Sequence, residues 1–134
     1  MANITAGIGR YDKYDPISGG FRAALAAKMD AIDAPFAVGL DSSGEVVVGS
    51  GVTGIIGVIA ITKNMKAGAV VDIMTHGEMV EVANVAAAKV LTGNTTTGVI
   101  GDTAASATQT PIGFTVEATR LIVRKSVAAF DAVA

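Results

Sequence analysis

The chain has 134 residues, 51% of them apolar, with 10 Lys and Arg against 12 Asp and Glu and no cysteine. This length suits one domain, and a net charge of −2 argues against a surface that neutralises phosphates, so we expect no nucleic-acid binding. The lack of cysteine excludes disulfides and thiolate metal sites. The longest apolar run, residues 55–61, falls short of the ~20 residues of a membrane helix, and the N-terminus has no secretory pattern. We therefore expect a protein made in the cytoplasm and without a membrane partner.

The first 35 residues differ in composition from the rest of the chain. They hold three of the six aromatic side chains, whereas from residue 36 onward short runs of Val, Ile and Thr are separated by glycine. We therefore divide the chain into an N-terminal arm, residues 1–35, and a β domain, residues 36–134. The composition gives the arm no core of its own, so its order would depend on a neighbouring molecule.

A cluster of aromatic and charged residues in the arm predicts a protein interface. Two tyrosines three residues apart alternate with side chains of both charges, and Pro16 favours an extended Asp15. Tyr and Arg supply large contact areas and hydrogen bonds at interfaces. The residues that we expect to contact a partner are Arg10, Tyr11, Tyr14, Asp15, Pro16, Phe21, Arg22 and Leu25. The alternative is a polar tail that is ordered only by contacts with its own chain or a crystal neighbour.

The second half of the arm has a helical spacing of apolar residues. Phe21, Leu25, Met29 and Ile32 are separated by four, four and three positions, which predicts a short helix. So short a helix is not stable alone in water, so it must dock or remain irregular.

From residue 36 the pattern predicts short strands. Residues 36–40 and 45–48 form a hairpin, because residues 41–44, Asp-Ser-Ser-Gly, have turn chemistry. Further strands are predicted over residues 55–62, 69–75, 78–83, 89–92, 97–100, 112–118 and 121–125, and a loop over 102–111. In the strand at 112–118, Phe114 and Val116 are expected on one face and Thr115 on the other. Short strands at this spacing indicate an all-β fold, a small antiparallel barrel or sandwich.

Three motifs could carry chemistry, and each has a simpler explanation. Residues 49–54 spell G-x-G-x-x-G, but the β-branched run that follows disfavours the helix that a dinucleotide site needs. His76 is the only histidine, and it falls in a predicted turn without the further ligands of a zinc site. Lys66 follows Met65 in a turn, as the modified lysine does in biotinyl and lipoyl carrier domains. A solvated turn lysine is the simpler interpretation, so we expect no enzyme, metal or cofactor.

Several of these segments resemble one protein family. The stretches FAVGL at 36–40, GIIGVIA at 54–60 and KAGAVVDIMTHGE at 66–78 look like the strands and turns of head decoration (capsid cement) proteins of tailed bacteriophages. KYDP at 13–16 and GGFR at 19–22 resemble the arms of such proteins in phages of actinobacteria.

The resemblance implies a tulip-like β-barrel on the outer surface of an icosahedral virion. Such proteins usually form homotrimers and bridge subunits of the major capsid protein against the pressure of packaged DNA. The expected partners are therefore the major capsid protein and other copies of the chain. The alternatives are a small β-fold binding or carrier module that uses Lys66, and another minor structural protein of the virion.

Overall fold

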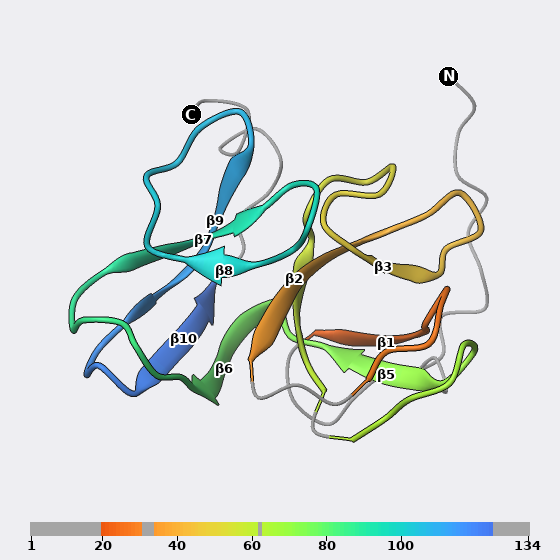
Figure 1. Cartoon of the computed structure of the whole chain (residues 1–134), viewed down its shortest axis with the longest axis horizontal. Helices are drawn as coiled ribbons and strands as arrows, with labels where there is room; N and C mark the ends of the chain where they lie inside the picture. The colour runs from red at the N-terminus through yellow and green to blue at the C-terminus, as the bar shows by residue number, and fades with distance from the viewer. Residues whose placement is uncertain (1–19, 31–33, 62, 125–134) are drawn as a thin grey trace, which may run out of the picture.

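The computed structural model describes residues 20–30, 34–61 and 63–124, and every regular element in these ranges is a strand (Figure 1). The strands are β1 (Phe21–Ala24), β2 (Pro35–Leu40), β3 (Val46–Val48), β4 (Gly57–Ala60), β5 (Val70–Ile73), β6 (His76–Glu81), β7 (Val90–Asn94), β8 (Ile100–Gly101), β9 (Gln109–Thr115) and β10 (Arg120–Arg124). The all-β prediction is confirmed. Within these ranges, no helix is long and apolar enough to cross a membrane.

The strands form three antiparallel sheets. Two are small, β1–β5 and β3–β2–β4, and the third has five strands in the order β6–β10–β9–β7–β8. Isolated bridges join the small sheets where Leu25 meets Val46 and where Val58 meets Met74. In Figure 1 the small sheets lie on the right and the five-stranded sheet on the left. The sheets do not close into one continuous ladder, so the architecture is closer to a sandwich than to a closed barrel.

Strands β2 and β4 separate two apolar cores. Val38 and Ile59 face the first core, and their chain neighbours Ala37 and Val58 face the second, because successive side chains of a strand point to opposite sides. The first core also holds Leu25, Val46, Ile61, Val71 and Ile73; the second also holds Ile55, Leu91, Ile112, Leu121 and Val123. Because β4 has an apolar core on each of its two faces, residues 55–61 are apolar without alternation.

The predicted hairpin is confirmed as β2–β3. The Asp41 carboxylate accepts hydrogen bonds from the backbone N–H groups of Ser43 and Glu45, both at 2.9 Å. Gly44 has a φ of 78°, the left-handed conformation that glycine adopts most readily. The predicted pairing of residues 89–92 with 97–100 and the final strand pair are also present, as β7–β8 and β9–β10.

The helix predicted from Phe21 onward is wrong over residues 20–30, and Ile32, the last residue of its pattern, lies outside the described residues. Phe21–Ala24 forms β1, which pairs with β5, and Met29 then bridges Met65 through two backbone hydrogen bonds of 2.9 and 2.7 Å. A spacing of four is an even number, so it also places Phe21 and Leu25 on one side of an extended chain. The edge of β5 supplies hydrogen bonds that a short isolated helix could not match in stability.

Candidate interaction surface

Five of the eight residues expected to contact a partner lie outside the described residues. These are Arg10, Tyr11, Tyr14, Asp15 and Pro16. The other three belong to β1 or follow it directly, and the structure gives each a different environment.

Of these three, Arg22 is exposed, Phe21 is half-buried and Leu25 is buried. The Nε of Arg22 donates to Oδ1 of Asp72 at 2.6 Å across the β1–β5 pair, and both side chains are well exposed. Phe21 packs against the first core. Leu25 is 1% exposed and belongs to that core, so the expectation that it contacts a partner is corrected: it packs inside its own domain. Residues 20–30 are thus built into the β fold.

The glycine-rich segment 49–54 has no geometry for binding phosphate. The backbone N–H groups of Gly49, Ser50 and Val52 donate at 2.8–2.9 Å to carbonyls of the chain's own strands and turns. A phosphate loop needs such groups to be available to the ligand, and a helix start after them. Strand β4 follows this segment, not a helix.

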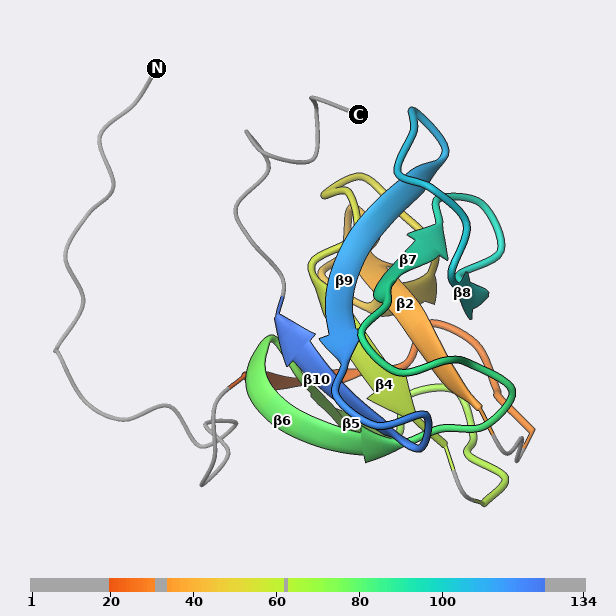
Figure 2. The same cartoon turned by 90° about the vertical axis from the view of Figure 1, so that its left-hand side faces the viewer.

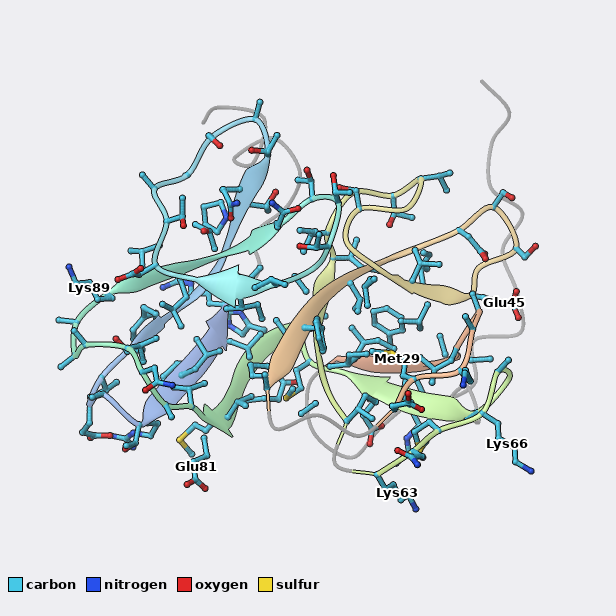
Figure 3. All side chains as sticks on the ribbon, viewed as in Figure 1. Met29, Glu45, Lys63, Lys66, Glu81 and Lys89 are labelled. Carbon is cyan, nitrogen blue, oxygen red and sulfur yellow. The ribbon has the colours of Figure 1, made fainter. Side chains whose placement is uncertain are left out.

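His76 and Lys66 are both exposed. His76 begins β6 opposite Arg124, and its backbone N–H donates to Oε1 of Glu78 at 2.7 Å. The described part of the chain contains no group of three or more His, Cys, Asp or Glu that could hold a metal ion. Lys66 stands in a tight turn closed by a backbone hydrogen bond from Ala69, and its side chain points away from the domain (Figure 3).

The most unusual surface lies on the outer face of the five-stranded sheet. Val90, Phe114, Ile122 and Met79 are direct cross-strand neighbours on β7, β9, β10 and β6, and we call them the outer row. Val90 is 61% exposed, Met79 63% and Phe114 37%, while Ile122 is partly buried. Figure 2 looks onto this sheet. The solvated face of an antiparallel sheet is normally polar, so a row that is apolar across four strands indicates a contact surface.

A β-bulge turns Phe114 outward. The β7–β9 register shifts at Leu91 and Thr92, leaving Ile112 as the extra residue on β9. Ile112 is therefore fully buried although Phe114, two positions later, is exposed. The sequence correctly separates Phe114 from Thr115, but only the bulge decides that Phe114 faces solvent. No local pattern in the sequence predicts this bulge, because it depends on the pairing of β7 with β9.

Charged side chains of both signs border the outer row. The guanidinium of Arg120 forms an ion pair with Glu117, at 2.9 Å for Nε and Oε2, and its NH1 lies 3.9 Å from Sδ of Met79. Glu81 is the cross-strand neighbour of Arg120, and Lys89 precedes the row on β7. Figure 3 shows Glu81 and Lys89 projecting at the periphery of the domain. An apolar centre with a charged rim is the usual anatomy of a protein interface.

Comparison with known proteins is informative at the level of the fold. No family model matches the chain, and no curated protein matches it. A solved structure from Mycobacterium phage Patience superposes with a TM-score of 0.67, covering 86% of this chain and 95% of that chain at 18% sequence identity. At this identity the likeness concerns the fold alone, so the chain has the same fold as a phage protein.

Proposed function

We propose that the chain is a non-enzymatic structural protein of a phage virion. In this proposal it binds the outer surface of an icosahedral capsid and bridges neighbouring subunits of the major capsid protein. The observation that carries the proposal is the outer row, an exposed apolar strip on a fold shared with a phage protein. The resemblance of residues 36–78 to capsid decoration proteins supports the same function.

The physical basis is burial of the outer row against the shell. Removing apolar surface from water contributes roughly 25 cal/mol per Å². Phe114 at the centre supplies an aromatic anchor, since a few central side chains usually dominate binding energy. The charged groups of Arg120, Glu81 and Lys89 remain at the rim, where they orient the contact and contribute little to affinity.

The arm and self-association add further contacts. Arg10, Tyr11, Tyr14, Asp15 and Pro16 precede the described domain and would extend the contact along the shell. A homotrimer at three-fold positions would hold three such arms. Avidity then rises well above the affinity of one arm without any new type of contact.

A binding experiment tests this function. Purified chain is mixed with capsids assembled from the major capsid protein encoded by the same genome, and occupancy is measured by sedimentation. We expect Phe114→Ser to lower the apparent affinity about tenfold, the equivalent of about 1.4 kcal/mol. The matched control is Val52→Ser, because Val52 is 72% exposed but lies in the 49–54 loop and is not part of the outer row. Wild-type chain that does not bind these capsids would refute the proposal.

A carrier module is the second candidate, because Lys66 is exposed at a tight turn. Intact mass after expression with biotinylating and lipoylating enzymes distinguishes the two functions. We expect the unmodified mass. A covalent adduct that is lost in Lys66→Arg would establish the carrier function instead.

A further inference from the structure

Strand β6 has an unpaired edge beside an apolar groove. Among the described residues β6 pairs only with β10, so its other edge has no partner strand. A groove of about 560 Å³ is lined by the second half of β6, from Met79 to Glu81, and by the residues that follow it. Pro35 of β2 and the end of β4 with Ile61 line this groove, and so do Val80 of β6 and the next residues, Val82 and Ala83. Glu81 is the single charged residue among the described groove residues.

An edge of this kind can accept another strand. The unpaired N–H and C=O groups form a ladder with the incoming backbone, and the neighbouring pockets select its alternate side chains. The groove borders residues 79–83, five residues or about 17 Å of extended chain. The groove therefore suits an extended segment with small and aliphatic side chains on one face and a cation near Glu81.

The chain itself contains such a segment before its described domain. Residues 4–11 read ITAGIGRY, so that in an extended conformation Ile4, Ala6 and Ile8 would share one face. Arg10 follows on that face, and glycine or threonine alternates with these residues. We propose that residues 4–11 of a second copy add to the edge of β6, with the isoleucines in the groove and the guanidinium of Arg10 near the carboxylate of Glu81.

The chain between residues 4–11 and the described domain is long enough to reach a second copy. Gly20 already lies beside β6, since a Cβ on Gly20 would be 3.1 Å from Oε2 of Glu78. The eight residues 12–19 connect this segment to Gly20 and can span about 26 Å when extended. This length is enough to link adjacent copies. The inference rests on the proposed function, because binding to a shell would hold the copies side by side.

Cysteine cross-linking tests the pairing, because the wild-type chain has no cysteine. Two full-length single-cysteine chains, one enlarged by a tag, are mixed and oxidised with copper phenanthroline. The arm cysteine is placed in turn at Ile4, Ala6 and Ile8, and the receiving cysteine at the exposed Ala83. The control receiver is Val52→Cys in the 49–54 loop, which lies at the top of Figure 1, whereas β6 lies at the bottom.

We expect at least one arm position to give about tenfold more mixed disulfide dimer with Ala83→Cys than with Val52→Cys, because docking raises the local concentration of the two thiols. Adding Glu81→Lys to the receiving chain should lower the yield. Equal yields with the two receivers would overturn the inference. So would a disulfide formed only within one chain when both cysteines are on it. Capsid occupancy of the same chains is measured separately, so failure of the pairing is distinguishable from failure of the proposed function.

Discussion

The two faces of the five-stranded sheet are both apolar, but only one is covered. On the inner face Leu91, Leu121 and Val123 are at most 1% exposed, whereas on the outer face Val90 and Met79 exceed 60%. Inner residues hold the sheet against β2 and β4, so their apolar character is explained by folding. Val90 and Met79 in the outer row have no such explanation, because their side chains gain little by folding. This difference is the basis on which the outer row is proposed as a contact surface.

Removing an inner side chain should give the largest loss of stability. Leu121→Ala leaves a cavity in the second core, and such truncations cost about 2–5 kcal/mol. Ile122→Ala is the matched control, since Ile122 is the next residue and points to the outer face. Because Ile122 is partly buried, we expect Ile122→Ala to lower the unfolding free energy less than Leu121→Ala, by about 1–2 kcal/mol in chemical denaturation. Equal losses would remove the distinction between the faces.

A glycine pair in the same sheet tests how tightly the inner face packs. A Cβ on Gly93 would lie 2.3 Å from Cβ of Ala37, whereas one on Gly101 meets no atom within 4 Å. We expect Gly93→Ala to cost about 1–3 kcal/mol through overpacking. Gly101→Ala should be neutral or slightly stabilising, because alanine lowers the entropy of the unfolded chain. Thermal unfolding of the two variants measures the difference in stability. A Gly93→Ala variant as stable as the wild type would show that β7 is not tightly packed against β2.

Charges on the outer row should separate binding from stability. In Met79→Lys and Val90→Lys the new ammonium groups remain in water in the isolated chain, so the unfolding free energy should change by less than about 0.5 kcal/mol. On a capsid the same charges would be buried without a partner, and occupancy should fall by about tenfold or more. Sedimentation of the variants with capsids measures this occupancy. Undiminished occupancy would exclude the outer row as the contact.

The smallest effect is expected at the rim. Arg120→Ala breaks the ion pair with Glu117, in which the two side chains are 42% and 58% exposed. Exposed pairs contribute little, so stability should fall by less than about 0.5 kcal/mol and the difference should shrink at high salt. Denaturation at low and high salt checks this. A loss above 1 kcal/mol would mean that the rim belongs to the folding core.

The sequence predicted the elements whose signals are local. The hairpin with its Asp41 and Gly44 turn follows from side-chain and backbone preferences within a few residues. The helix predicted from Phe21 to Met29 was wrong, because a four-residue spacing fits both a helix and a strand. Pairing with β5, which is distant in the sequence, decides in favour of the strand. The orientation of Phe114 depends on a bulge set by the pairing of β7 with β9, which no local pattern reveals.

The most direct test of the account is a cryo-EM map of the virion or of capsids decorated with the full chain. We predict density for the β domain on the outside of the shell, with the outer row of the five-stranded sheet buried against the major capsid protein. Absence of the chain from the particle, or an outer row that faces solvent in every bound copy, would contradict it.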